Sequence, residues 1–430
     1  MILSIILFFA LFLVLIFIGV PIGVSLGSTA LILIVKYSMG IQVFSANFYA
    51  GIAKFPLLAI PFFILAGVIF EKADIAKRIV DFSRLIVGNM TGGLAIVTII
   101  VAIFWGAVSG SGPATTAVLG LILIPAMVAD GYDKGFASAV TASSSGLAII
   151  IPPSIAFIVY GLITQDSVSA LFAAGVVPGL IIGLCLIIAA YLVSKKKGYK
   201  VKNVEKLTLK SFLLVLKDAF WGLLAPVIIL GSIYGGIATP TEAAVIAVFY
   251  GVFVGFFIYK TLTLKILYKA LITSVVSSAV VMIVVSFAGL YSWVGNVLGI
   301  MDMVANGIIN FSDNPIVVIL LINVTILIAG MFLDAISIYY VFLPIFIPII
   351  HHFGWNSIWF GVVLTINLAI GQVTPPVAVN MYVASNVADV PIEDISKWAF
   401  LFVLASVFGL VIIILFPELT LWLPKLLNLM

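Results

Sequence analysis

The chain has 430 residues, of which 64% are hydrophobic and only 8% are Asp, Glu, Lys or Arg. Soluble domains carry about 25% charged residues, so this composition excludes an ordinary soluble protein and indicates a membrane protein. The formal net charge of +4 reports orientation in a bilayer and does not indicate a nucleic-acid partner. The single cysteine, Cys185, excludes a disulfide framework and a thiolate metal site.

Apolar segments long enough to approach or cross a hydrocarbon core about 30 Å thick recur along the whole chain. The first has no basic leading region, so we interpret it as a span and not as a signal peptide. Uninterrupted apolar helices are predicted at residues 1–18, 22–36, 56–71, 167–194, 219–235, 237–259, 273–291 and 397–416. Residues 72–88 are amphipathic and are expected to rest in the membrane interface. Four further regions are apolar but interrupted by Gly, Pro and Ser: 93–129, 134–163, 315–350 and 355–388.

The basic residues predict the orientation of these segments in the membrane. Eight lysines between residues 195 and 217 mark one loop as cytoplasmic. If regions 93–129 and 315–350 are hairpins that enter and leave on one side, 17 of the 20 basic residues lie on the cytoplasmic side and both termini face outward. Treating both regions as full crossings would require a different assignment of sides, so the charge pattern favours hairpins.

An internal repeat links the four interrupted regions. Each copy has a proline in a short apolar motif and a pair of prolines that begins 27 residues later. In the first copy these are the proline of Ile124–Ala126 and the pair Pro152-Pro153; in the second they are the proline of Ile347–Ile349 and the pair Pro375-Pro376. One offset of 223 residues relates both pairs, and it also relates Gly146 to Ala369 and Ala107 to Gly330. Prolines are common in membrane helices, so a single matched pair could arise by chance. Two matched pairs favour a repeat. Because one hairpin enters from inside and the other from outside, the repeat is predicted to be inverted, as in many secondary transporters.

The first copy contains two stretches of irregular backbone at membrane depth. Ten of the eleven residues of Gly106–Thr116 are Gly, Ala, Ser, Thr or Pro, which predicts a re-entrant hairpin tip; the alternative is a small-residue seam for helix packing. Pro152 and Pro153 cannot donate hydrogen bonds, so carbonyls upstream, including that of Ile149, are expected to be free and able to hold a cation. Helix N-termini and hydroxyls beside them can hold a carboxylate. The alternative for the prolines is a simple kink.

In the second copy the predicted tip is 329–334 and the predicted break is 371–376. Asp334 is the one acid expected at midmembrane depth. An ionisable group at that depth indicates a functional role. Asp334 also stands where the second hairpin helix is expected to begin, so a role as the N-cap of that helix is equally open.

Six separated segments give the chain a family resemblance. They are PFFILAG (61–67), SGSGPATTA (109–117), IPPS (151–154), GIATPTEAA (236–244), GMFLD (330–334) and TPP (374–376). In this order they resemble the large membrane subunit of tripartite ATP-independent periplasmic (TRAP) transporters, the DctM-type permeases. The resemblance covers essentially the whole chain.

The resemblance implies an all-α polytopic membrane protein that works as an elevator, with a fixed scaffold and a moving transport domain built from two re-entrant hairpins and two broken helices. The expected divisions are a first scaffold part at 1–92, transport-domain repeat 1 at 93–166, scaffold with interfacial helices at 167–314, transport-domain repeat 2 at 315–390 and a C-terminal scaffold helix at 391–430.

The resemblance also implies binding sites for at least two sodium ions and one carboxylate. The expected ligands of the first sodium are Ala107, Ser109, Gly146, Ile149 and Ile151. Those of the second are Gly330, Ala369, Gln372 and Thr374, with Asp334 as a possible tip residue. The substrate carboxylate is assigned to Ser109, Ser111 and Ser154, with Ser144 and Ser145 in reserve.

The function implied is sodium-coupled symport of an organic acid, with sialic acid favoured over C4-dicarboxylates, across the bacterial inner membrane into the cytoplasm. The expected partners are a small four-helix membrane subunit (DctQ-type) and a periplasmic substrate-binding protein (DctP-type). The alternative within transport is a stand-alone sodium-coupled anion symporter. An intramembrane enzyme would need a nucleophile–base pair or metal ligands at depth, and the sequence predicts neither.

Overall fold

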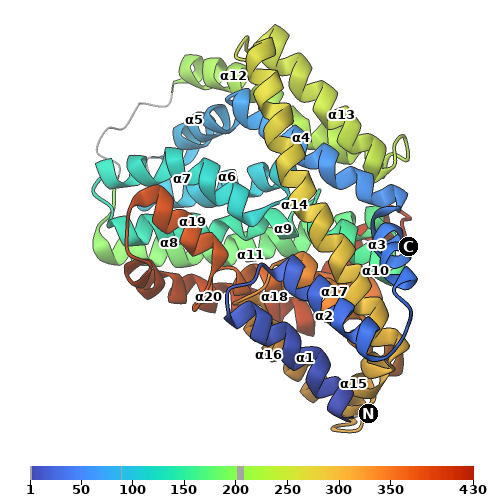
Figure 1. Cartoon of the computed structure of the whole chain (residues 1–430). Helices are drawn as coiled ribbons and strands as arrows, with labels where there is room; N and C mark the ends of the chain where they lie inside the picture. The colour runs from blue at the N-terminus through green and yellow to red at the C-terminus, as the bar shows by residue number, and fades with distance from the viewer. Residues whose placement is uncertain (1, 89, 201–207) are drawn as a thin grey trace.

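Every regular element in residues 2–88, 90–200 and 208–430, the part of the chain that the computed structural model describes, is a helix (Figure 1). Nine helical stretches in this part have at least 18 residues and are apolar enough to cross a membrane. The predicted all-α, polytopic membrane fold is therefore confirmed. Lys202 and Lys206, two of the eight lysines in the predicted cytoplasmic loop, lie outside the described residues.

The longest helix, α14 (Leu264–Val297), crosses the molecule diagonally in Figure 1 and organises one group of helices. It extends beyond the predicted 273–291, and the exposed Lys265 and Lys269 lie in its first turns. Several helices pack around α14 or on its neighbours. This group comprises α1 (Ile2–Phe17), α2 (Ile22–Lys36), α3 (Gln42–Ile52), η1 (Phe55–Leu58), α4 (Ala59–Lys72), α5 (Ile75–Val87), α12 (Leu209–Tyr234), α13 (Pro240–Phe253) with the π-helix η2 (Val254–Ile258), and α15 (Ile300–Ile309).

The four interrupted regions form the second group. Each folds as helices separated by a short irregular break. In the first copy these are α6 (Gly93–Ser109), α7 (Gly112–Ala129), α8 (Lys134–Ser145), α9 (Leu147–Ile150) and α10 (Ile155–Thr164). In the second copy they are α16 (Pro315–Gly330), α17 (Ala335–His352), α18 (Ser357–Gly371) and α19 (Val379–Ala388).

The first hairpin enters and leaves at one end of the molecule. The backbone N–H of Gly92, just before α6, donates to the carbonyl of Tyr199 (3.0 Å). The N–H of Asp133, just after α7, donates to the hydroxyl of the same tyrosine (3.2 Å). Tyr199 follows the lysines that end α11 (Val168–Lys197). Both ends of the hairpin therefore lie beside the predicted cytoplasmic loop, as the charge pattern indicated.

The offset of 223 residues extends well beyond the proline motifs. It carries α10 onto α19, the interfacial helix α5 onto α15, and α11 onto α20 (Ile392–Leu415), in each case to within a few residues at the ends. The chain is therefore built from two copies of one helical plan. The short helix α21 (Glu418–Leu426) follows them.

Two matching polar contacts show that the copies run in opposite directions. Lys134 Nζ, at the start of α8, donates to the carbonyl of Asp389, just after α19 (3.2 Å). Ser357 Oγ, at the start of α18, donates to Asp166 Oδ2, just after α10 (2.5 Å). The offset maps Lys134 onto Ser357 and Asp166 onto Asp389. Each broken helix thus begins where the other ends, so the repeat is inverted.

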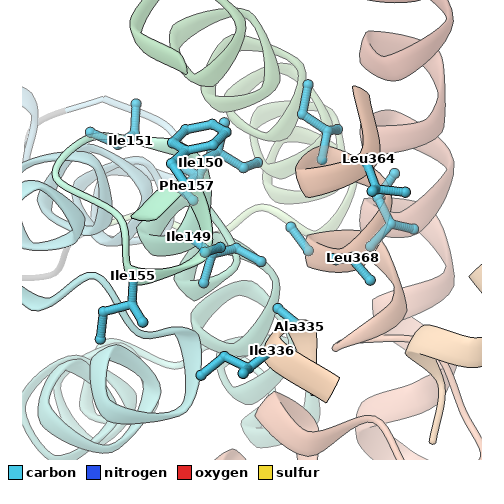
Figure 2. Close-up of a cluster of buried hydrophobic side chains, with 14 of the residues drawn as sticks. Ile149, Ile150, Ile151, Ile155, Phe157, Ala335, Ile336, Leu364 and Leu368 are labelled. Carbon is cyan, nitrogen blue, oxygen red and sulfur yellow. The ribbon is translucent and has the colours of Figure 1, made fainter. Parts of the chain in front are cut away.

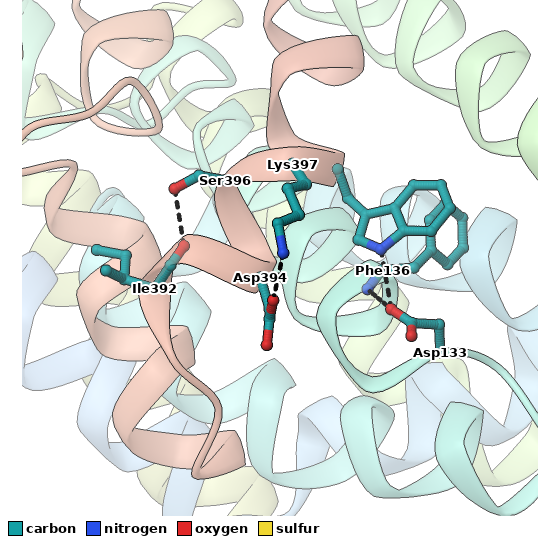
Figure 3. A network of polar contacts seen from close by, with 7 residues as sticks. Asp133, Phe136, Ile392, Asp394, Ser396 and Lys397 are labelled. Atoms are coloured by element: carbon teal, nitrogen blue, oxygen red, sulfur yellow. Dashed lines mark hydrogen bonds and ion pairs between the residues drawn. The ribbon is translucent and has the colours of Figure 1, made fainter.

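Helices α11 and α20 pack with the second group, against α6, α8, α9 and α18, and α11 touches α12 only marginally. Figure 3 shows one of the attachments: Asp133 Oδ1 accepts hydrogen bonds from the N–H of Phe136 (2.8 Å) and from Trp398 Nε1 in α20 (2.9 Å). This packing differs from the predicted division, which assigned both helices to the scaffold. The division into moving and fixed parts itself stays a prediction.

The interfacial helix α5 is anchored to the first group by one arginine. Arg78 pairs with Asp218 of α12, and its guanidinium lies 3.9 Å from the ring centroid of Tyr259, which follows η2. The hydroxyl of Tyr259 in turn donates to the carbonyl of Asp218 (2.6 Å). A desolvated cation over an aromatic ring adds to the ion pair. Because α5 also packs on α6, it connects the two groups at the end predicted to be cytoplasmic.

The outer contact between the broken helices is open to a direct test. We expect Asp166→Ala to lower the free energy of unfolding by about 1–3 kcal/mol, because the variant removes the acceptor of the Ser357 hydroxyl. The measurement is the thermal unfolding midpoint of the purified protein in detergent. Asp313→Ala is the matched control, since Asp313 is exposed and outside any helix. Equal midpoints for both variants would contradict this role.

Candidate functional site

The tip of the first hairpin is a two-residue turn. Helix α6 ends at Ser109 and α7 begins at Gly112. Gly110 closes the turn with a φ of +62°, a backbone conformation that side chains disfavour. The hairpin lies backbone to backbone on the broken helix, because a Cβ added to Gly106 would be 2.8 Å from the Cα of Ala148. The small-residue run therefore forms a tip, as the sequence predicted.

The first break joins α9 to α10 through Ile151–Ser154, with a cis peptide bond between Pro152 and Pro153. The hydroxyl of Ser154 donates to the carbonyl of Ile149 (2.6 Å). The prediction that this carbonyl is free was therefore wrong: a nearby serine satisfies it, as buried polar groups require. The carbonyl oxygen keeps a second lone pair that a cation can use.

The two reserve serines lie within α8 and use their hydroxyls locally. Ser144 Oγ and Ser145 Oγ both donate to the carbonyl of Thr141, at 3.1 and 2.7 Å. Both side chains are fully buried. Neither residue lines the cavity at the hairpin tip described below.

The second copy repeats this arrangement. A Cβ added to Gly371 would lie 2.8 Å from the Cα of Gly330, so this hairpin also meets its broken helix backbone to backbone. Asp334 is the N-cap of α17, with Oδ1 accepting from the N–H of Ser337 (3.4 Å). The offset relates Asp334 to Ser111, which holds the N-cap position of α7. The capping alternative for Asp334 is thus realised in the structure. Thr374 Oγ1 donates to the carbonyl of Ile370 (2.7 Å).

The two breaks meet at the centre of the repeat. A Cβ added to Gly146 would lie 3.2 Å from the carbonyl oxygen of Ala369. Because these residues are repeat counterparts, the pseudo-two-fold axis passes between them. Figure 2 shows apolar packing beside the first break: Ile149 of α9 and Ile155 of α10 belong to one cluster of buried side chains with Ile336 at the start of α17. The two predicted sodium sites are therefore neighbours across the axis.

Two amide side chains beside the first hairpin carry buried polar atoms, and the sequence analysis missed one of them, Asn380. Gln372 Oε1 and Asn380 Oδ1 have no hydrogen-bond partner among the described residues. Both approach Gly112, where an added Cβ would lie 2.5 Å from Gln372 Oε1 and 3.0 Å from Asn380 Oδ1. Asn380 Nδ2 donates to the carbonyl of Ala142 (3.4 Å). The signal that could have revealed Asn380 is a polar residue four positions after the proline pair.

Three helices begin around the first tip. Helix α7 begins at Gly112, next to the side chain of Asn380 at the start of α19. Gly110 lies against the backbone N of Ile155, the first residue of α10, which a Cβ would approach to 3.5 Å. Helix N-termini carry partial positive charge and unpaired N–H groups, so their meeting point favours an anion.

A cavity of about 210 Å³ opens at this tip. Ser109 and Ser111 line one wall together with Trp105, Ala114, Val118 and Ile155; the opposite wall consists of α4 and α14, with Ile64, Gly67, Val68, Glu71, Ser277 and Val281. Helix α7 runs from the tip toward the end that the charge pattern predicts to be cytoplasmic, and α4 reaches that end at Lys72. The cavity, which we call the inner chamber, therefore lies on the predicted cytoplasmic side of the tip.

Two serines predicted to bind substrate, Ser109 and Ser111, face the inner chamber together, and Ser154 lies behind them at the break. An inverted repeat with broken helices that meet within the membrane is typical of the class of secondary transporters.

Comparison with known proteins identifies the family. Residues 9–419 match the family described as the tripartite ATP-independent periplasmic transporter, DctM component. The chain therefore belongs to the large permease subunits of TRAP transporters, and it is a multi-pass protein of the bacterial inner membrane. The relatives reported below are permeases and not enzymes.

Three relatives show the range within the family. The chain is 39% identical to the isethionate TRAP transporter permease protein DctMQ of Oleidesulfovibrio alaskensis, covering 86% of this chain and 59% of that protein. It is 36% identical to the C4-dicarboxylate large permease DctM of Pseudomonas aeruginosa, covering 93% and 94%. It is 36% identical to the sialic acid large permease SiaM of Vibrio cholerae, covering 92% of each.

The fold is also similar to that of a solved transporter. The Alcanivorax borkumensis YdaH transporter aligns with a TM-score of 0.65 over 89% of each chain at 12% identity. At that identity the similarity concerns the fold alone.

The backbone contacts between hairpins and broken helices predict the effect of a single added methyl group. We expect Gly106→Ala and Gly371→Ala each to lower the free energy of unfolding by about 1–3 kcal/mol, because the new Cβ meets backbone that cannot rotate away. Thermal unfolding in detergent measures the loss. Gly231→Ala in α12 is the control, since, apart from its own stretch of helix, none of the described residues has an atom within 4 Å of its Cβ position. A smaller loss in Gly106→Ala than in the control would refute the close approach.

Proposed function

We propose that this chain carries an organic acid, together with sodium ions, across the inner membrane into the cytoplasm by sliding the hairpins and broken helices past α14 and its neighbours. The observation that carries the proposal is that two helices, α7 and α10, begin at one chamber lined by two serines, while a third helix, α19, begins beside Gly112 at the same tip. These groups attract a carboxylate or sulfonate without supplying a fixed positive charge. An anion bound there needs a cation to move with it across an apolar barrier.

The residues near the two breaks fit sodium as the accompanying ion. Hard cations prefer oxygen ligands, and Gln372 Oε1 is a buried oxygen without a partner among the described residues. For the first ion we propose the carbonyls of Ala107, Gly146, Ile149 and Ile151 with Ser109. For the second we propose Gly330, Ala369, Gln372 and Thr374.

Coupling between ion and anion follows from their positions. Gln372, a proposed sodium ligand, lies beside Gly112 at the start of α7, where the anion is proposed to bind. A sodium ion near Gln372 stabilises a nearby carboxylate, and the carboxylate stabilises the ion by the same free energy. Binding of either partner alone is then the weaker event.

The chamber suggests which state of the cycle the structure represents. The inner chamber lies on the cytoplasmic side of the first tip, so we propose that the structure is inward-facing. In this state cargo leaves past α4 and α7. The outward-facing state then requires the second group of helices, including α11 and α20, to move toward the outside.

We further propose that the chain works with a small membrane subunit and a periplasmic binding protein, as the tripartite family description suggests. The chain spans 59% of the length of the relative named DctMQ. The relatives are named for isethionate, C4-dicarboxylates and sialic acid. Their common feature is an acidic group on a small organic molecule, and that is the cargo class we propose.

Sodium coupling predicts the outcome of an uptake experiment. Proteoliposomes containing this chain, its small subunit and the loaded binding protein are given an inward gradient of sodium or of potassium at the same clamped membrane potential. We expect uptake only with sodium, because under the proposed coupling the anion is bound and transported only when sodium ions are bound as well. Equal uptake from both gradients would sink the coupling proposal. Uptake without the small subunit and binding protein would instead favour a stand-alone symporter.

The anion site predicts the effect of losing one hydroxyl. We expect Ser109→Ala to reduce uptake about 10- to 100-fold, because a hydrogen bond to a charged group contributes about 1.5–3 kcal/mol. Ser45→Ala is the matched control, since Ser45 is exposed in α3. Assembly with the small subunit is checked by co-purification. Unaltered uptake by an assembled Ser109→Ala variant would remove Ser109 from the site.

A further inference from the structure

The two hairpins present equivalent faces to different surroundings. On α7 of the first hairpin, Ala114 is exposed and Val118 is half-buried, and both line the inner chamber. The offset of 223 relates them to Ser337 and Val341 on α17 of the second hairpin, which are 0% and 1% exposed. The face that is open in one copy is sealed in the other.

Helix α17 is covered both by α10 and by two helices of the scaffold group. Helix α17 packs along α14 and α15, whereas α7 is separated from α4 by the inner chamber. A Cβ added to Gly289 of α14 would lie 3.7 Å from Cε1 of Tyr340. That face of α17 therefore has no access to solvent in this structure.

The scaffold meets the two hairpins at different heights. In the first copy a Cβ on Gly67 of α4 would lie 3.6 Å from the Cα of Ser109, at the tip itself. In the second copy Gly289, the counterpart of Ala66, meets Tyr340, six residues beyond the N-cap Asp334. At 1.5 Å per helical residue this is about 9 Å along α17. The scaffold therefore contacts the first hairpin at its tip and the second hairpin further along its second helix.

The sealed face carries two buried hydroxyls, and that of Ser337 lies beside the Asp334 carboxyl. Ser337 Oγ and the hydroxyl of Tyr340 are buried without a hydrogen-bond partner among the described residues. Their counterparts on α7 are Ala114 and Ala117. Leaving hydroxyls unpaired in the interior is costly, so such groups call for an explanation. If these side chains served only to fill space, Ala in place of Ser337 and Phe in place of Tyr340 would pack equally well without burying a hydroxyl.

We propose that the face of α17 bearing Ser337 and Tyr340 is the polar wall of an outer chamber, exposed to the periplasm in the outward-facing state, where its hydroxyls contact the arriving organic anion. The inference rests on the proposed function, since it requires a second state. In that state the surroundings of the copies exchange: α7 packs against α4, and α17 leaves α14. The N-terminal turn of α17, which holds Ser337, then lies at the outer edge of the second tip.

Thiol labelling tests the proposal directly. In a Cys185→Ala background, Ser337→Cys and, separately, Ala114→Cys are treated with a membrane-impermeant charged thiol reagent from either side of oriented vesicles, with and without sodium and loaded binding protein outside. We expect Ser337→Cys to react only from the periplasmic side, and faster during turnover. Ala114→Cys, the matched counterpart, is expected to react only from the cytoplasmic side.

The outcomes separate the inference from the function on which it rests. If Ser337→Cys still transports but stays unreactive from outside, or reacts from the cytoplasmic side, the outer chamber is overturned while symport stands. If the wild-type complex shows no sodium-dependent uptake, the proposed function fails irrespective of the labelling.

A second variant asks whether the Tyr340 hydroxyl belongs to the open state. In the inward-facing state the Tyr340 hydroxyl is buried without a partner in the part of the chain that the structure describes, and in the proposed open state it is hydrogen-bonded. Tyr340→Phe removes this hydroxyl and therefore stabilises the inward-facing state relative to the outward-facing state. We expect external labelling of Ser337→Cys to slow about tenfold when Tyr340→Phe is added. Unchanged or faster labelling would show that the hydroxyl makes no better contact in the other state, and would remove Tyr340 from the proposed wall.

Discussion

The arrangement of this protein depends on one requirement: irregular backbone at membrane depth must find its partners inside the protein. The chain meets this requirement by packing each hairpin directly against the broken helix of its own copy. The first tip lies on the broken helix at Gly106 and Ala148, the second at Gly330 and Gly371. The hydroxyl of Ser154 satisfies the carbonyl of Ile149 across the first break. Each contact exists because the residues are small or carry a short polar side chain.

This requirement also places the ligand-binding groups. A helix interrupted within the membrane exposes an N-terminus at its second half, and three such ends gather at the first tip. The same interruption exposes carbonyls at the end of the first half. Anion-attracting and cation-attracting groups therefore arise side by side from backbone alone, with few charged side chains. That economy suits the proposed transport mechanism, in which a permanent charge at the site would have to be carried across an apolar barrier on every empty return.

Inverted symmetry gives such a protein two related states from one sequence. Contacts at the ends of the broken helices obey the symmetry: Lys134 with Asp389, and Ser357 with Asp166. Contacts between the hairpins and the scaffold do not, since α17 is sealed and α7 borders a chamber. The symmetric contacts hold the second group together as a unit. The asymmetric ones are those that motion would exchange.

The sequence alone determined the membrane class, the two hairpins, the two breaks and the repeat, because composition, paired prolines and a run of small residues act locally and leave a direct signature. It did not reveal that Ser154 satisfies the carbonyl of Ile149, that Asn380 reaches Gly112, or that α11 and α20 pack with the broken helices. These depend on contacts between segments far apart in the chain. Only the tertiary structure decided which hairpin faces an open chamber, because the symmetric sequence permits either and packing against the scaffold selects one.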